Sequence, residues 1–433
     1  MSRNAEVGLL LVAAVLAAMG TALANFPNGV GLDAQVALTF VVFVAAFGSV
    51  HLSLRRWAPT ASPFLFPIGA LLVAIGLTEV YRLEADSLGA LQRWWLLAGG
   101  LAASLTIFLL RERGVLALRR YRYLMLAASV ALLLLPLLPD DWPVRGAEVN
   151  GSRLWVLIEL PFGGQRSLSF QPGEAAKVLL TIFLASYLAD RHTAMAQVTR
   201  RIGWLEIPEP RQFGPILLAA FAAFGVLVYQ RDLGASLLLF TLFVGLIFMA
   251  TGKAAYLVAG GGLLAGGGLL AHQMFDHVQR RVVAWLDPFE DFTGSGFQIA
   301  QSLFALGSGS LTGSGVGLGR PDLIPAAETD FIFAAVGEEM GFAGSVAVIA
   351  AFALLVAIGF GIALRSRDVF RKFLAAGLTL VVGSQAVIII AGVIRLLPVT
   401  GITLPFMSYG GSSLLANMVI LALLARISHG ERA

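Results

Sequence analysis

The sequence of 433 residues contains no cysteine and little charge. Without cysteine the chain can form no disulfide and no thiolate metal site, and it has no cysteine nucleophile. Only 13% of its residues are charged and 58% are hydrophobic, whereas soluble globular proteins carry about a quarter charged residues. This composition excludes a cytosolic enzyme and a disordered chain, and it predicts an all-α polytopic membrane protein. The net charge of +4 alone does not indicate a nucleic-acid partner, and we expect none.

A membrane-spanning helix needs roughly 20 mostly apolar residues. About twelve segments fit, centred on residues 6–25, 33–52, 63–80, 92–110, 122–138, 173–189, 213–229, 233–251, 254–272, 329–360, 373–393 and 403–425. With the N-terminus in the cytoplasm, about two thirds of the basic residues fall on the inner side, so both termini are expected there. The first segment ends in Ala22-Leu23-Ala24, which could also be a signal-peptidase site, but the apolar stretch is long enough to span.

Two outside loops, residues 140–172 and 273–328, are much longer than the connections of about 2–8 residues that are usual in helix bundles. The second loop, between the ninth and tenth spans, holds Asp287, Glu290 and Asp291 beside aromatic residues. Partial burial by these aromatics would raise the pKa of a carboxylate toward the range of a general base. The alternative is a solvated acidic turn. The pattern of residues 297–306 predicts a short interfacial helix after this turn, or a lid that packs on the bundle.

The same loop continues into a glycine-rich tract, residues 307–319. Backbone amides in such a tract can bind a phosphate, but no strand precedes it, so we expect no nucleotide cofactor. The five histidines show no metal-ligand spacing.

Ionisable residues near span ends are costly in lipid and are therefore functional candidates. Glu174 and Lys177 are three residues apart on one helix, so they either pair with each other or present a cation to an anionic group. Asp330 begins the tenth span and Arg395 ends the eleventh. The polar, glycine-rich run 398–413 lies at membrane depth, which requires that it be buried in protein or line a cavity.

Several segments together, in this order, resemble the SEDS family (shape, elongation, division and sporulation) of RodA and FtsW proteins, over about residues 63–425. The matching segments are Asn150-Gly-Ser-Arg153-Leu-Trp155, Phe170-Gln-Pro-Gly-Glu174-Ala-Ala-Lys177, Gln230-Arg-Asp232-Leu-Gly234, Leu286-Asp-Pro-Phe-Glu-Asp291-Phe-Thr-Gly294-Ser-Gly296-Phe-Gln298 through Ser302, Glu328-Thr-Asp330-Phe-Ile-Phe333 with Gly337-Glu-Glu339-Met-Gly341, and Leu404-Pro-Phe-Met-Ser408-Tyr409-Gly-Gly-Ser412-Ser413. The resemblance implies a ten-span core, residues 61–433, preceded by two extra spans in residues 1–60.

The resemblance also implies a function: a peptidoglycan glycosyltransferase in the bacterial cell membrane that polymerises lipid II on the outer face. Its partners would be lipid II, undecaprenyl pyrophosphate, a class B penicillin-binding protein that crosslinks the strands, and other elongation or division membrane proteins. The family's essential loop aspartate falls on Asp291. In that role Asp291 would take the proton from the 4-hydroxyl of the acceptor GlcNAc as it attacks the donor MurNAc, with inversion at the anomeric carbon.

The departing pyrophosphate would need a positive partner, which Lys177, Arg153, Arg395 or a divalent cation such as Mg²⁺ or Mn²⁺ could supply, with Asp291 a conceivable metal ligand. The other candidate substrate-binding residues come from the matched segments. They are Glu174, Gln298, Ser302, Asp330, Ser408, Tyr409 and Ser412.

Two rival functions fit part of the sequence. A lipid II flippase would also use charges at membrane depth, and a non-catalytic scaffold for division or elongation would leave the loop carboxylates incidental. An acidic turn on a long outside loop favours polymerisation. The segment Pro398-Val-Thr-Gly401 favours an elongation role of the RodA type, whereas Gly401-Ile-Thr-Leu-Pro405 weakly favours division.

Overall fold

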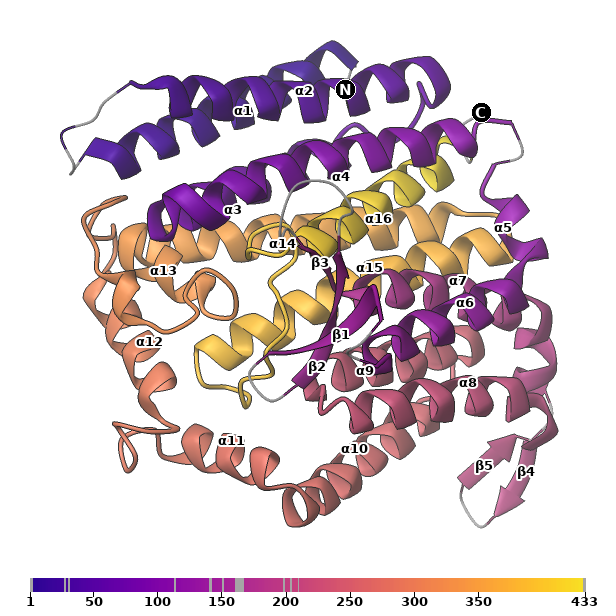
Figure 1. The fold of residues 1–433 in the computed structure, drawn as a ribbon. Helices are drawn as coiled ribbons and strands as arrows, with labels where there is room; N and C mark the ends of the chain where they lie inside the picture. The colour runs from indigo at the N-terminus through magenta and orange to yellow at the C-terminus, as the bar shows by residue number, and fades with distance from the viewer. Residues whose placement is uncertain are drawn as a thin grey trace. The chain divides into compact units, whose positions relative to one another are not determined.

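The computed structural model describes residues 3–26, 29, 32–112, 114–139, 142–149, 152–159, 167–197, 199–202, 205–208 and 210–430. Asn150 and Gly151 of the first matching segment and much of the predicted outside loop 140–172 lie outside these residues. The described chain is mostly helical, which confirms the all-α class (Figure 1). It forms two compact units, one of Met1–Glu112, Gly267–Ile358 and Val382–Ala433, the other of Arg113–Gly266 and Gly359–Val381.

The first unit contains long helices from both ends of the chain and the short elements of the large loop. Its elements are α1 (Arg3–Asn25), α2 (Ala34–Trp57), α3 (Leu65–Leu83), η2 (Ala85–Gly89), α4 (Ala90–Leu109), α11 (Asp276–Leu286), α12 (Phe297–Ser308), η4 (Pro321–Leu323), α13 (Ile332–Glu339) and α16 (Gly411–Gly430). The boundary between the units falls within α10 (Ala255–Met274), α14 (Gly341–Arg365) and α15 (Val369–Val393).

The second unit combines helices with two small antiparallel sheets that the sequence analysis did not predict. Its elements are α5 (Leu116–Arg120), α6 (Arg122–Leu134), η3 (Leu135–Leu137), β1 (Val144–Val149), β2 (Ser152–Glu159), β3 (Ser167–Phe170), α7 (Pro172–Gln197), β4 (Thr199–Ile202), β5 (Leu205–Pro208), α8 (Pro210–Tyr229) and α9 (Leu233–Thr251). Strands β1, β2 and β3 pair in that order, and β4 pairs with β5. Within this unit α7 packs on α6 and α9.

Nine helices in the described residues are long and apolar enough to cross a membrane, which makes the chain a multi-pass membrane protein. They are α1, α2, α3, α7, α9, α10, α14, α15 and α16. Helices α4, α6 and α8 occupy the remaining predicted spans but are not among the nine, so the count of twelve stays a prediction.

Two predicted spans begin later than the apolar pattern indicated. The predicted span 329–360 is broken, because α13 ends at Glu339 and α14 starts at Gly341, whose φ of 69° turns the chain. Asp330 therefore lies in a turn before both helices rather than on a long membrane helix. The last predicted span, 403–425, also begins late, since residues 403–410 form an irregular segment and α16 starts at Gly411.

The two N-terminal helices pack on the helices that follow them: α1 contacts α2 and α3, and α2 contacts α4 (Figure 1). Glycines allow close approach, since a Cβ on Gly20 would lie 2.0 Å from Thr78 Oγ1 and one on Gly100 would lie 2.7 Å from the Ala46 carbonyl oxygen. These helices are thus built into the first unit, although the predicted division at residue 60 stays a prediction.

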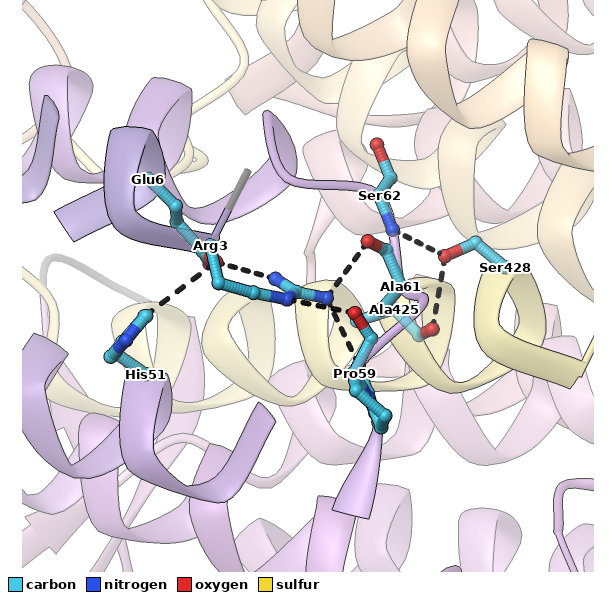
Figure 2. Close-up of polar contacts among 9 residues, drawn as sticks. Arg3, Glu6, His51, Pro59, Ala61, Ser62, Ala425 and Ser428 are labelled. Carbon is cyan, nitrogen blue, oxygen red and sulfur yellow. Dashed lines mark hydrogen bonds and ion pairs between the residues drawn. The ribbon is translucent and has the colours of Figure 1, made fainter. Parts of the chain in front are cut away.

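A polar cluster fixes the start of α1 (Figure 2). Glu6 is completely buried, and its carboxylate accepts a hydrogen bond of 2.5 Å from Arg3 and lies 3.6 Å from His51 Nδ1 on α2. The same Arg3 guanidinium donates to the carbonyl oxygens of Ala58 and Ala61, at 2.9 and 2.8 Å. Arg3 thus compensates the buried acid and binds the connection between α2 and α3.

Candidate active site

The candidate catalytic loop, residues 287–296, connects α11 to α12, and Asp291 is exposed on it. The backbone turns around this residue, because the N–H groups of Gly294 and Gly296 both donate to the Asp291 carbonyl oxygen, at 3.1 and 3.2 Å. The N–H and hydroxyl of Ser295 donate to carboxylate Oδ2, at 2.7 and 3.0 Å. A Cβ on Gly294 would lie 2.3 Å from Oδ2, so a glycine is needed for the carboxylate to fold back onto the turn.

These donors hold the pKa of Asp291 below its usual value: the backbone N–H and the hydroxyl of Ser295 are the main causes. The expectation of a pKa raised by neighbouring aromatics is wrong for Asp291. The rings pack on α12 instead, with Phe304 lying 6.0 Å from Phe289 and 6.1 Å from Phe292 between ring centroids. The carboxylate therefore faces solvent and is ionised at neutral pH.

Helix α11 is fixed to the segment that follows α15 by side chains one helical turn apart. Arg281 donates through Nη1 to the carbonyl oxygens of Val399 and Thr400, at 3.3 and 3.0 Å. Trp285 Nε1 donates to the Arg395 carbonyl oxygen at 3.1 Å, and Arg395 Nε donates back to the Trp285 carbonyl oxygen at 2.8 Å. Arg395 was expected from the sequence, whereas Arg281 and the role of Trp285 were not, although residues 276–286 are strongly amphipathic.

Asp330 lies near Arg281. A Cβ on Gly401 would be 3.6 Å from Arg281 Nη2 and 3.7 Å from Asp330 Oδ2, so both side chains converge on this glycine. Removal from water raises the pKa of Asp330 to about 6, against the opposing effects of the Arg281 charge and a hydrogen bond from Thr329. Asp330 is therefore the carboxyl group at this site that changes charge near neutral pH.

The irregular segment 402–410 is mostly buried in protein, as its polar sequence required. Buried Ser408 donates to the Thr329 carbonyl oxygen at 2.5 Å, and its hydroxyl accepts from the Leu404 N–H at 2.8 Å. The Tyr409 N–H donates to the Glu328 carbonyl oxygen at 2.7 Å. Tyr409 keeps part of its side chain exposed, whereas Ser412 is buried at the start of α16. These contacts bring Ser408 and Tyr409 beside the turn that carries Asp330.

The two candidates on α12 differ in accessibility. Gln298 is exposed and donates to the Pro325 carbonyl oxygen at 3.4 Å. Ser302 is completely buried and donates to the Val393 carbonyl oxygen at 3.0 Å, at the end of α15. In this structure Ser302 therefore joins α12 to α15, and Gln298 is the one that a substrate can reach.

Backbone N–H groups in and next to the glycine tract donate hydrogen bonds to the acidic side chains of α13, which follows the tract in sequence. Gly317 N–H donates to Glu339 Oε2 at 2.9 Å, and Arg320 N–H donates to Glu338 Oε1 at 2.8 Å. Arg82 on α3 lies 3.3 Å from Glu339 Oε1. These amides are thus satisfied by the protein's own carboxylates, which argues against the tract as a phosphate site.

The second unit holds the remaining candidates. Lys177 and Glu174 are both buried on α7, and their charged atoms are 2.5 Å apart, which confirms that they pair. Arg153 lies on β2, directly opposite Glu148 of β1.

The described residues contain no group of three or more histidine, aspartate or glutamate side chains placed to hold a metal ion. One carboxylate, that of Asp291, does not by itself form a divalent-cation site. Binding of Mg²⁺ or Mn²⁺ therefore stays a prediction.

Comparisons with known proteins agree on one kind of relative. The family model of cell cycle proteins that covers FtsW, RodA and SpoVE matches residues 64–433. A curated relative from Mycobacterium tuberculosis, named peptidoglycan glycosyltransferase RodA, is 42% identical, over 99% of this chain and 91% of its own.

Two solved structures have a similar fold. A chain from a structure titled for the coordination of polymerisation and crosslinking by a peptidoglycan synthase complex is 27% identical with a TM-score of 0.66, over 86% of this chain and 98% of its own. The rod shape determining protein RodA of Thermus thermophilus is 26% identical with a TM-score of 0.55, over the same shares of the two chains.

Proposed function

The chain belongs to the cell cycle protein family of FtsW, RodA and SpoVE, and from this membership we infer that it is a peptidoglycan glycosyltransferase. We propose that it polymerises lipid II on the outer face of the bacterial cell membrane, with both termini in the cytoplasm. The observation that carries the proposal is the exposed, ionised Asp291 on a structured loop, at the position of the family's essential aspartate.

In the proposed reaction, Asp291 accepts the proton of the acceptor's 4-hydroxyl as that oxygen attacks the anomeric carbon of the donor MurNAc. The new bond joins this oxygen to the anomeric carbon, while the bond from that carbon to the pyrophosphate oxygen breaks. The electron pair leaves with undecaprenyl pyrophosphate. One displacement inverts an α-linked donor to a β-1,4 product, so one base suffices and no covalent intermediate forms.

The lowered pKa of Asp291 has two opposing effects on its role as a base. Its lowered pKa keeps it ionised, so the base form is always present, but a weaker base gains less from proton transfer. Ser295 donates both of its hydrogen bonds to Oδ2, so Oδ1 is the oxygen that we assign to the acceptor hydroxyl.

The leaving pyrophosphate requires a positive partner at the moment when its charge develops. Arg153 and Lys177 are the candidates in the second unit, and each lies beside an acidic residue, Glu148 and Glu174 respectively. Pairing fixes the position of each cation but reduces its net charge, so in this proposal each stabilises the pyrophosphate only in part.

We propose that the partner is a crosslinking enzyme, a class B penicillin-binding protein, and that the role is elongation, of the RodA type. The support is the near full-length similarity to a RodA and the fold shared with a chain of a peptidoglycan synthase complex.

The deciding experiment incubates purified protein, alone and with its partner transpeptidase, with labelled lipid II and divalent cation. Wild-type protein should produce glycan polymer, Asp291→Asn should produce none, and Asp287→Asn should retain activity. Asp287 is the matched control because it is an exposed aspartate of the same loop, whose carboxylate accepts a hydrogen bond from the Phe289 N–H at 3.1 Å. Normal polymerisation by Asp291→Asn would refute the assignment of the base. Translocation of lipid II in vesicles without polymer would instead support a flippase.

A further inference from the structure

Arg395 lies where two helices end. Helix α15 stops at Val393, and Arg395 follows with a φ of 60°, in the left-handed region that an arginine rarely adopts. The N–H of Leu396 donates to the Ala391 carbonyl oxygen at 2.7 Å, and the N–H of Arg395 donates to the Gly392 carbonyl oxygen at 3.1 Å. This pair of bonds is the Schellman motif, in which glycine usually holds the left-handed position.

The side chain of Arg395 ends the other helix. Its Nε donates to the Trp285 carbonyl oxygen at 2.8 Å and its Nη2 donates to the Leu286 carbonyl oxygen. These are the last two residues of α11, whose final carbonyl groups have no partner inside the helix. A guanidinium suits this position because it bonds both carbonyls at once and its charge opposes the negative end of the helix dipole.

The contact is reciprocal, since the indole N–H of Trp285 donates to the Arg395 carbonyl oxygen at 3.1 Å. Arg281, four residues earlier and on the same face of α11, is bonded to Val399 and Thr400. Helix α11 is thereby held at two points against residues 395–400. Leu286, whose carbonyl oxygen Arg395 bonds, is directly followed by the catalytic loop, and Asp291 lies five residues beyond Leu286.

We propose that Arg395 is a positioning residue for the catalytic loop, which it holds by capping the end of α11, and not the cation that neutralises the pyrophosphate. A left-handed arginine carries a conformational cost that glycine would not. The side-chain contacts give a reason for that cost. This proposal rests on the proposed role of Asp291 as the base.

The test compares Arg395→Gly and Arg395→Lys with the wild type and with Arg320→Gln. Arg320 is a suitable control because it is an exposed arginine of the large loop that also contains Asp291, and its side chain pairs with Asp322. Arg395→Gly should lower kcat at least tenfold, leave the KM for lipid II within twofold, and leave the thermal unfolding midpoint no lower. Arg395→Lys should lose kcat similarly, because an ammonium group cannot bond both carbonyls in the same way.

A second readout does not depend on activity. Because the sequence has no cysteine, Glu290→Cys provides a single site for a spin label on the loop. In the Arg395→Gly background the label should show greater mobility by electron paramagnetic resonance than in the wild-type or Arg320→Gln background.

Two results would overturn the proposal: a loop label equally mobile in Arg395→Gly and wild type, or an Arg395→Lys variant that keeps most of its activity while Arg395→Gly raises KM. The second result is expected of a cation that binds pyrophosphate. Failure of the proposed base would be visible separately, as full activity of Asp291→Asn.

Discussion

The carboxylate of Asp291 takes its chemical state from one neighbour. Ser295 donates both its N–H and its hydroxyl to Oδ2, and these two bonds stabilise the ionised form. Because the pKa of Asp291 lies below its usual value, we expect the ionised form of Asp291 to persist to lower pH than that of an ordinary aspartate.

Substituting Ser295→Ala removes the hydroxyl donor and keeps the N–H. The pKa of Asp291 should then rise, so the acid limb of the kcat/KM profile should move to higher pH by a fraction of a unit. The measurement is lipid II polymerisation over a pH series that extends below the ordinary pKa of an aspartate, about 3.9, with Thr293→Ala, an exposed hydroxyl in the same loop, as the control. An acid limb that stays in place would mean either that Ser295 does not set the pKa of Asp291 or that Asp291 is not the proposed base.

Asp330 behaves in the opposite way, because its pKa is raised to about 6. The folded state thus binds this proton more tightly than the unfolded chain, whose aspartates have a pKa of about 3.9. The stabilisation from the protonated form is fully present below about pH 4 and is lost as pH rises through about 6. Asp330→Asn, which mimics the protonated form, should therefore unfold at a higher temperature than wild type at pH 8.

This advantage of Asp330→Asn should shrink as the pH is lowered from 6 toward 4. Thermal unfolding in detergent at several pH values tests it, and Asp322→Asn, an exposed aspartate in the same loop, serves as the control. If the difference between Asp330→Asn and wild type were the same at pH 5 and pH 8, Asp330 would not titrate in this range.

At the level of elements, the glycine tract takes its structure from close contact with α13, the helix that follows it. Gly313 has a φ of 82°, and a Cβ there would lie 2.2 Å from the Glu339 carbonyl oxygen at the end of α13. Gly307, in the exposed last turn of α12, has no atom within 4 Å of such a Cβ. Glycine is therefore required at position 313, where backbone approaches closely, and is not required by any contact at position 307.

Gly313→Ala should destabilise the protein by about 2 kcal/mol or more, since it combines backbone strain with a clash against main chain. Gly307→Ala should stabilise it by up to about 1 kcal/mol, because alanine loses less entropy in a helix. Chemical denaturation of both variants in the same detergent measures the difference. Equal effects of the two substitutions would show that the tract does not pack on α13 as described.

The elements that could be predicted from sequence are those defined by long apolar runs, since their length and pattern depend on lipid alone. The break at Gly341 could not be predicted, because apolar residues continue on both sides of Glu338 and Glu339 and the turn depends on a contact with Gly313. The pairing of Glu174 with Lys177 was one of the two alternatives that their spacing on one helix predicted. The partners of Arg395, more than a hundred residues away in sequence, could not be predicted, because periodicity identifies a face and not what it contacts.

At the scale of the whole molecule, the N-terminal helices extend the family fold. The family model begins at residue 64, yet the Mycobacterium tuberculosis relative aligns over 99% of the chain, so the preceding helices are a feature shared with that protein. Within the first unit they join the two ends of the chain: Arg3 bonds the α2–α3 connection, and in that connection Ser62 N–H donates to Ser428 Oγ on α16 at 2.8 Å.

The effects of substituting Arg3 and Glu6 on the free energy of unfolding should therefore not be additive. Arg3→Met would leave a completely buried carboxylate without its main positive partner, which we expect to cost about 3 kcal/mol of stability. Glu6→Gln removes the buried charge, so the double variant should be more stable than Arg3→Met alone. Unfolding of the four proteins in a double-mutant cycle measures the coupling, with Arg56→Met, an exposed arginine of α2, as the control. Additive effects would mean that Glu6 gains nothing from Arg3, and Arg3 would then hold the start of α1 only through its bonds to the Ala58 and Ala61 carbonyl oxygens.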